Sequence, residues 1–280
     1  MISIIIPAHN ESAVIARTLR AITDGAEPGE LEVLVVCNGC TDQTASIARR
    51  FGSPVRVIET EVPSKTHALN LGDEETRGYP RIYLDADVLL EITAVRRLAA
   101  RLESGEVLAV APTANYDVSG CSMLVRAFFE VRSHLPSSRE GIGGSGVYAL
   151  SEAGRRRFGQ FPNLTADDGY VRVHYRTEER ETVLAAMSTV FPPRTLADLT
   201  AQKIRSHYGS FELQSMFPHL WQNRGESNNR TLIRLFRRPQ LWMGLAVYCS
   251  VMAFARHQAR KRLRNKISVW ERDNTSRSIA

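Results

Sequence analysis

The stretch Ile2-Ser3-Ile4-Ile5-Ile6-Pro7-Ala8-His9-Asn10-Glu11 changes within ten residues from mostly apolar, β-branched side chains to polar ones. A short apolar run of this kind is typical of a buried strand in a parallel sheet. The polar residues come where such a strand would end. We therefore predict a first buried strand that leads directly into a functional loop.

Similar apolar runs alternate with segments of helical period over the first 150 residues. Further strands are predicted at 32–36, 55–58, 81–84, 108–111 and 147–150, and helices at 13–22, 41–51, 66–76 and 92–102. This alternation is typical of an α/β fold with a mostly parallel sheet covered by helices, with ligands at the carboxyl ends of the strands. Asn10, Ser12 and Thr41 are predicted N-caps of the first two helices because their side chains can accept backbone hydrogen bonds.

The chain changes character after Pro192-Pro193, and no internal repeat or low-complexity tract precedes that point. Residues 195–217 are compatible with a helix, and 230–238 interleave apolar residues with four arginines, as an amphipathic helix would. We predict a main domain over 1–217 and a basic, apolar helical extension over 218–280.

The uncharged run 241–255 lies within this extension, between two arginines. A membrane-spanning helix needs about 20 apolar residues, so this run favours in-plane or re-entrant insertion. The alternative is a buried core helix followed by a solvated basic segment.

The positive charge is concentrated near the C-terminus, although the whole chain carries a formal net charge of +6. Residues 230–270 contain ten Lys or Arg and no Asp or Glu. Because residues 271–280 are neutral, residues 1–229 carry the remaining net charge of −4. This asymmetry argues against nucleic acid as a partner of the main domain and favours an anionic membrane surface. With no secretory signal pattern at the N-terminus, we expect a cytoplasmic protein, peripheral or monotopic at the inner face of the membrane.

Cys37-Asn38-Gly39-Cys40 has the spacing of a redox pair or of half a zinc site. A structural zinc site needs a second pair of ligands, and Cys121 and Cys249 are single and far apart. The redox interpretation ranks last among the alternatives.

Three predicted strands of the first half end in polar or small residues, namely 7–11, 37–42 and Asp85-Ala86-Asp87. Two carboxylates at positions i and i+2 can direct oxygens toward one hard cation when the chain turns between them. Mg²⁺ and Mn²⁺ favour such ligands and complete their shell with phosphate oxygens. The convergence of these ends predicts a metal-assisted phosphate site, although D-x-D alone is a weak signal.

A dinucleotide site is the obvious alternative for a Rossmann-like sheet. Strand one is followed by no glycine fingerprint, so a nicotinamide cofactor has no cradle there. Residues 141–146 match G-x-G-x-x-G by letters, but they follow a polar loop and enter a strand. A dinucleotide-binding fingerprint follows a strand and opens a helix, so this match does not predict a dinucleotide site.

These motifs together resemble family 2 glycosyltransferases of the GT-A fold. The resemblance lies in 3–11, 35–42, Lys65-Thr66-His67-Ala68-Leu69-Asn70 and 84–87, and it continues through 143–146, 158–162 and Asp167-Asp168. The order and spacing of these motifs match the family pattern, as their residues do, and the resemblance covers roughly residues 1–210. The resemblance implies a GT-A catalytic domain of the inverting, bacterial cell-envelope or exopolysaccharide type.

The resemblance assigns the nucleotide-sugar site residue by residue. Pro7, Ala8 and Glu11 are expected to line the nucleotide pocket, and Asn38 stands where the family usually has an aspartate that contacts the base. The resemblance further places Lys65 near the nucleotide or its phosphates, Asp85 toward the ribose and the metal, and Asp87 on the metal.

Asp168 resembles the family's catalytic base, and its neighbour Asp167 stays an alternative because sequence cannot separate adjacent carboxylates. The alternative is that Asp167 and Asp168 have no catalytic role and only form the acidic first turn of a helix, which the helix dipole favours. Gln202-Lys203-Ile204-Arg205-Ser206 resembles the Q-x-x-R-W motif of processive members, with Ser206 in place of tryptophan. Arg205 is expected to hold the diphosphate, and His207 is a further candidate metal ligand.

The sequence therefore predicts a Mg²⁺- or Mn²⁺-dependent, inverting transfer of one sugar from a UDP or GDP sugar to a hydroxyl. The acceptor is expected to be a saccharide or, in view of the basic extension, a lipid-linked saccharide used in cell-envelope or exopolysaccharide synthesis. Two alternatives stay open, a sugar nucleotidyltransferase and a non-catalytic membrane subunit that binds sugar nucleotides.

Overall fold

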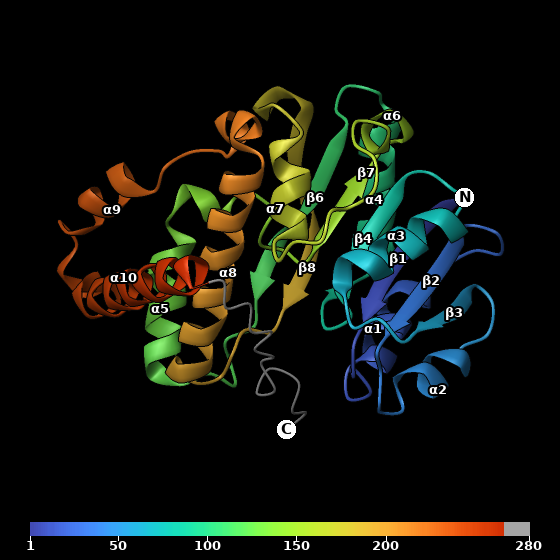
Figure 1. Cartoon of the computed structure of the whole chain (residues 1–280), viewed down its shortest axis with the longest axis horizontal. Helices are drawn as coiled ribbons and strands as arrows, with labels where there is room; N and C mark the ends of the chain where they lie inside the picture. The colour runs from blue at the N-terminus through green and yellow to red at the C-terminus, as the bar shows by residue number, and fades with distance from the viewer. Residues whose placement is uncertain (266–280) are drawn as a thin grey trace.

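The computed structural model describes residues 1–265, and its centre is one sheet of eight strands (Figure 1). The strands are β1 (Ile2–Ala8), β2 (Leu31–Asn38), β3 (Val55–Thr60), β4 (Arg81–Leu84), β5 (Leu89–Leu90), β6 (Ala109–Tyr116), β7 (Val147–Leu150) and β8 (Arg180–Val190). Their order across the sheet is β3-β2-β1-β4-β7-β6-β8-β5.

The sheet is mixed and mostly parallel, as predicted. β1 pairs in parallel with β2 and β4, and β2 pairs in parallel with β3. β7 runs antiparallel between β4 and β6, and β8 lies parallel to β6. Because β1, β2 and β4 are parallel, their carboxyl ends meet at the same edge of the sheet.

Helices cover both faces of the sheet. They are α1 (Ile15–Thr23), α2 (Thr44–Arg49), α3 (Lys65–Glu75), α4 (Ile92–Glu103), α5 (Met123–Ser133), α6 (Glu152–Arg155), α7 (Asp167–Val173), α8 (Leu196–Met216), α9 (Asn229–Leu235) and α10 (Trp242–Arg264). Short 3-10 turns are η1 (Pro136–Ser138), η2 (Thr177–Glu179), η3 (Pro218–Asn223) and η4 (Pro239–Leu241).

The alternation of side chains along β1 explains the two buried layers. Ile4 and Ile6 pack with α1, α2 and α4, whereas Ile5 packs on the opposite face with Leu69 of α3 and Tyr170 of α7. A strand with isoleucine on both faces needs cover on both sides, since successive side chains point to opposite faces. The uninterrupted apolar run is thus accounted for by two helical layers.

The predicted strands and helices of the first half are present, with bounds that differ by a few residues. β8 was missed, although its residues 183–187 are all apolar. Leu184 and Met187 in this strand are 80% and 53% exposed, so burial left little pattern to detect.

The predicted N-caps at Asn10, Ser12 and Thr41 are wrong. α1 begins only after Val14 and α2 only after Gln43, and neither helix has a side-chain cap. Oδ1 of Asn10 instead accepts hydrogen bonds from the backbone nitrogens of Thr41 and Asp42 at 2.7 and 3.2 Å. These polar residues join the loops after β1 and β2.

The helix predicted over 195–217 is α8, and Thr195 caps it by accepting a hydrogen bond from the backbone nitrogen of Asp198. The run 241–255 becomes the first part of α10, whose inner face packs against α5 and α8 (Figure 1). No described helix has both the length and the apolar content to cross a membrane. Residues 266–280 of the predicted extension lie outside the described residues, and its boundary at 217 stays a prediction.

A buried charged cluster joins α3, β4 and α6. Asp73 forms ion pairs with Arg81 at 2.6 Å and with Arg155 at 2.8 Å. Its carboxylate also accepts a hydrogen bond from the hydroxyl of Tyr83 at 2.7 Å. Only 8% of the Asp73 side chain is exposed. One carboxylate thus compensates two guanidinium groups on different elements.

We expect Asp73→Asn to lower the free energy of unfolding by about 3–5 kcal/mol, because removing one partner of a buried pair leaves the other charges uncompensated. Chemical denaturation measures this difference. Glu74→Gln is the control, because Glu74 is the next residue in the chain and its side chain is exposed. We expect this variant to change the free energy of unfolding by no more than about 0.5 kcal/mol. A loss no larger for Asp73→Asn than for the control would contradict this account of the cluster.

Candidate active site

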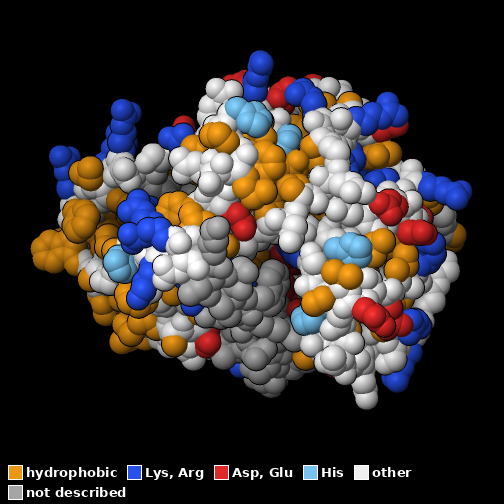
Figure 2. Space-filling model, viewed as in Figure 1, with side chains coloured by type: hydrophobic (Ala, Val, Ile, Leu, Met, Phe, Trp, Pro, Cys, Tyr) orange, Lys and Arg blue, Asp and Glu red, His pale blue; other side chains and the backbone are white. Residues whose placement is uncertain are grey.

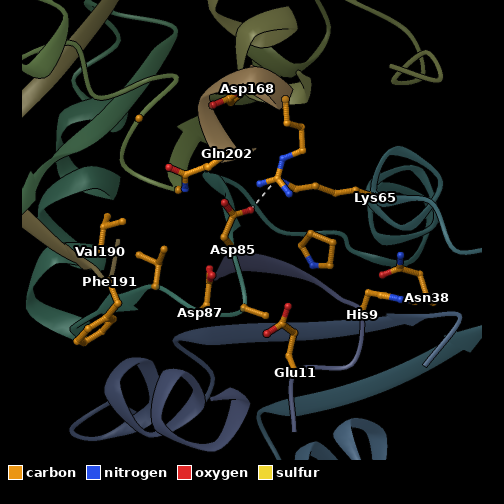
Figure 3. A pocket seen from close by; sticks show the side chains of 16 residues that line it. His9, Glu11, Asn38, Lys65, Asp85, Asp87, Asp168, Val190, Phe191 and Gln202 are labelled. Atoms are coloured by element: carbon orange, nitrogen blue, oxygen red, sulfur yellow. Dashed lines mark hydrogen bonds and ion pairs between the residues drawn. The ribbon is translucent and has the colours of Figure 1, made fainter. Parts of the chain in front are cut away.

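The polar ends of β1, β2 and β4 surround one cavity of about 260 Å³, here called the first cavity. In Figure 3, Asp85 lies between Glu11 at one end of this cavity and Asp168 at the other. The predicted site residues that line it are Pro7, Glu11, Asn38, Lys65, Asp85, Asp87, Asp168 and Arg205. Residues from six separate parts of the chain therefore meet at the edge of the sheet where ligands were expected.

Lys65 is the electrostatic centre of the site. Its Nζ lies 2.7 Å from Oδ1 of Asp85 and 3.1 Å from Oδ1 of Asp167. Burial lowers the pKa of Lys65, but the carboxylates of Asp167 and Asp85 outweigh burial, so the pKa is raised and the ammonium stays charged. Lys65 begins α3, whose N-cap Ser64 accepts from the backbone nitrogen of His67. The helix start thus carries a lysine that links the end of β4 to α7.

Asp167 and Asp168 are the first two residues of α7, so they do form the acidic helix start that was the alternative interpretation. Their environments differ. Asp167 is 4% exposed and ion-paired with Lys65, and burial raises its pKa to about 6 although Lys65 opposes this. Asp168 is less buried, and its Oδ1 accepts from the backbone nitrogen of Gly169 at 2.7 Å. Only Asp168 of the two lines the first cavity.

A second cavity of about 360 Å³ adjoins the first. Both are lined by Lys65, Asp85, Gly144, Asp168, Val190, Gln202 and Arg205. The second cavity extends away from the sheet edge between α5, α7 and α8, where it is lined by Arg132, Arg172 and Lys203. Asp168 therefore faces two adjoining chambers.

Two glycines allow the close approaches that shape this junction. Gly146 has φ +66°, and a Cβ there would lie 2.6 Å from Cγ2 of Val88 and 3.2 Å from Oδ2 of Asp85. Gly209 of α8 faces the residue before α7, and a Cβ there would lie 2.9 Å from Cβ of Ala166. Larger residues would displace Asp85 in the first case and the start of α7 in the second.

The side chains of Asp85 and Asp87 suit a divalent cation only in part. Within residues 1–265, no group of three or more His, Cys, Asp or Glu side chains could hold a metal ion. Two carboxylates on one cavity wall nevertheless supply the hard oxygen ligands that Mg²⁺ and Mn²⁺ prefer, with phosphate and water oxygens to complete the shell. The residues fit a metal that binds together with a phosphate-bearing ligand.

Two predicted site residues do not line either cavity. Ala8 is fully buried, and its side chain packs in the layer beneath α1 and α2. His207 lies on α8, stacked on Phe211, and its pKa is lowered to about 4 by burial and by Arg256. His207 lines neither of the two cavities, so the structure does not bring it to Asp85 or Asp87.

Several cavity residues were not predicted as site residues. Gln202 and His9 lie inside motifs that the sequence does contain, so their positions could have been inferred. Phe191, Arg132 and Arg172 belong to no motif, and only the packing of β8, α5 and α7 brings them to the cavities.

The C-x-x-C cysteines are both free thiols, with Cys37 buried in the core. Sγ of Cys40 donates to the carbonyl oxygen of Ala8 at 3.3 Å and accepts from the backbone nitrogen of Asn10 at 3.3 Å. Cys40 thus helps to join the loops after β1 and β2.

Solved structures with the same fold define the class of this protein. Mannosyltransferase PcManGT from Pyrobaculum calidifontis, in complex with GDP-Man and Mn²⁺, aligns with 95% of this chain and 79% of its own length, with a TM-score of 0.61 and 20% identity. Glucosyl-3-phosphoglycerate synthase from Mycobacterium tuberculosis, in complex with Mn²⁺, UDP and phosphoglyceric acid, aligns over 77% and 78% of the two chains, with a TM-score of 0.56 and 21% identity. The fold is that of GT-A proteins.

The sequence places the chain within this class. Residues 3–141 match the family model of Glycosyl transferase family 2, and the chain belongs to that family. The "Probable glycosyltransferase YdaM" of Bacillus subtilis is 34% identical over 113 residues, which is 38% of this chain. The matches cover between 18% and 30% of the length of the curated relatives.

Proposed function

We propose that this protein transfers one sugar from a nucleoside diphosphate sugar, with a UDP or GDP carrier, to an acceptor hydroxyl with inversion at the anomeric carbon. The observation that carries the proposal is the pair of adjoining cavities with Asp168 at their junction. A donor in the first cavity and an acceptor in the second would meet at this carboxylate. The family match, the GDP-Man bound by one structural relative and the UDP bound by the other support the same reaction.

The first cavity suits the donor. Asn38 and Glu11 lie at the end farthest from Asp168 (Figure 3), and we assign them to the nucleoside. Asp85 lies in the middle, held by Lys65, where the ribose and the first phosphate would follow. Arg205, which lines both cavities, is assigned to the diphosphate because a guanidinium binds phosphate oxygens in pairs.

Asp168 is assigned as the base. Inverting transfer needs a carboxylate beside the acceptor hydroxyl, opposite the departing diphosphate, to accept the proton as the new bond forms. The carboxylate of Asp168 faces both chambers, whereas Asp167 is buried and committed to Lys65. We therefore assign Asp167 to positioning Lys65 and the start of α7.

Asp87 and Asp85 are assigned as ligands of Mg²⁺ or Mn²⁺. A bound divalent ion would neutralise the charge that grows on the leaving diphosphate. Lys65 and Arg205 add positive charge to the same junction.

A panel of nucleotide sugars tests the proposal directly. The purified protein is incubated with each UDP or GDP sugar, with Mn²⁺ or with a chelator, and thermal stabilisation and release of nucleoside diphosphate are measured. We expect the nucleotide sugars of one nucleobase, uracil or guanine, to raise the unfolding temperature by several degrees in the presence of metal. No stabilisation by any nucleotide sugar would overturn the proposal, and release of pyrophosphate from sugar phosphate and nucleoside triphosphate would favour a nucleotidyltransferase.

We further propose that the acceptor is presented at an anionic membrane surface. The outer face of α9 and α10 exposes a set of large apolar side chains, here called the apolar face: Ile233, Phe236, Trp242, Met243 and Phe254. Figure 2 shows hydrophobic side chains gathered with Lys and Arg at this end of the molecule. Arginines 230, 234, 237 and 238 are exposed beside it. Apolar side chains flanked by arginines are typical of helices that lie in the interface of an anionic bilayer.

Substitutions test this face better than truncation, because α10 also covers apolar side chains of α5 and α8. We expect Trp242→Ser combined with Phe236→Ser to reduce binding to vesicles containing phosphatidylglycerol at least tenfold, since about 2–3 kcal/mol of apolar burial is lost per large side chain. Vesicle flotation measures binding. Met123→Ser, an exposed apolar residue on α5, is the control. Wild-type protein that fails to float with these vesicles would end the membrane proposal.

A further inference from the structure

The second cavity carries more positive charge than its own carboxylates can compensate. Lys65 is already paired with Asp85 and Asp167, which leaves Asp168 as the remaining carboxylate in its lining. Four further cations line the cavity, namely Arg132, Arg172, Lys203 and Arg205. The excess lies on the side away from the nucleotide end of the first cavity.

The described contacts of these cations are incomplete. Arg172 has one ion pair, to Glu140 at 3.3 Å, and Arg132 donates to the hydroxyl of Tyr116 at 2.9 Å. The Nε atoms of both arginines are buried without a hydrogen-bond partner. Among residues 1–265, no carboxylate lies within ion-pair distance of Lys203. Its Nζ lies 5.9 Å from the centre of the Phe128 ring.

The position of Lys203 is costly unless an anion binds there. Burial, followed by the positive charges of Arg132 and Arg205, lowers the pKa of Lys203 to about 7. Three cations held close together around a cavity repel one another, and a phosphate or carboxylate between them would relieve that repulsion. A cavity of about 360 Å³ has room for such a group and for the sugar or glycerol unit to which it is attached.

We infer that the second cavity binds an acceptor that carries an anionic group, a phosphate or a carboxylate, held by Lys203 and Arg132. This inference rests on the proposed function, because it treats the second cavity as the acceptor site. The anion would lie between α5 and α8, and the acceptor hydroxyl would then face Asp168 at the junction. Of the two cavities at the junction, Lys203 and Arg132 line the second and not the first, so they are available to the acceptor while Arg205 serves the donor.

Inorganic phosphate is the first probe, because its binding does not require transfer. Calorimetry is done on the full chain saturated with nucleoside diphosphate and Mn²⁺, so that the first cavity is filled. We expect Lys203→Met to weaken phosphate binding at least tenfold, because the variant loses a charge-assisted hydrogen bond from the ammonium to the anion. Lys261→Met, an exposed lysine on α10, is the matched control. The variant should fold, because methionine replaces an ammonium whose burial is unfavourable.

Acceptor pairs then identify the source of the anion. Transfer is compared between glycerol 3-phosphate and glycerol, and between polyprenyl phosphate and polyprenol in vesicles. Preference for one phosphorylated acceptor, reduced at least tenfold by Lys203→Met with donor KM unchanged, would support the inference. Wild-type protein that binds no phosphate, or a variant that binds it like wild type, would overturn the inference. Absence of transfer together with Lys203-dependent phosphate binding would count against the proposed reaction alone.

Discussion

Replacing Asp168 by asparagine is expected to reduce sugar transfer by about 10²–10⁴-fold, the usual contribution of a positioned general base. Donor affinity should change less than about threefold, because Asp168 lies at the far end of the first cavity from the nucleoside residues. The asparagine oxygen can still accept from the backbone nitrogen of Gly169, so the start of α7 is preserved. Transfer rates and nucleoside diphosphate affinity, measured on the same preparation, separate the two effects.

The structure also distinguishes Asp168→Asn from its neighbour. Asp167→Asn removes one of the two carboxylates that hold Lys65, so we expect lower thermal stability and weaker donor binding together. Glu178→Gln, an exposed carboxylate after α7, is the control and should leave both quantities unchanged. Near-normal transfer by both single variants at Asp167 and Asp168 would refute the assignment of the base.

Asp87→Asn is expected to remove the metal dependence of donor binding. In the wild-type protein we expect chelation to weaken nucleoside diphosphate affinity at least about a hundredfold, because Asp87 would help to hold a divalent ion that offsets the negative charge of the phosphates. In the variant, affinity should be low with and without Mn²⁺. Calorimetric titration of the nucleotide under both conditions measures this interaction.

The control for Asp87 must account for Arg17, whose pKa is lowered by burial and raised in part by the charge of Asp87. Thermal unfolding of the unliganded variant reports any loss from this contact. Glu61→Gln, an exposed carboxylate between β3 and α3, should behave like wild type in every assay. An Asp87→Asn protein that still binds nucleotide more tightly with metal would show that the ion is held elsewhere.

Much of the first half of the fold could be predicted from sequence because its strands are buried on both faces. Isoleucine and valine runs in β1 and β2 leave a continuous apolar signal, and both β4 and β7 were predicted with their observed bounds. β8 was not predicted because large side chains of its apolar run 183–187 are open to solvent, so apolar character does not follow burial along this strand. The N-caps were misplaced because Asn10 and Thr41 hydrogen-bond between two loops that are far apart in sequence.

The donor half of the site was accessible from sequence for a similar reason. Its residues follow strands, and parallel strands bring their carboxyl ends together whatever the loops contain. Lys203 and Arg132 carry no such signal, because their approach depends on the packing of α5 against α8. Ala8 was assigned to the pocket from its motif, yet the alternation of β1 turns its side chain into the core.

Gly209 of α8 packs directly against Ala166, the residue before α7, with no room for a side chain between them. The opposite side of α8 carries α10, whose outer surface includes the apolar face. α8 therefore lies between α10 and the first turn of α7, which carries Asp168. A side chain larger than glycine at position 209 would push α8 and α7 apart and would displace that carboxylate from the junction of the cavities.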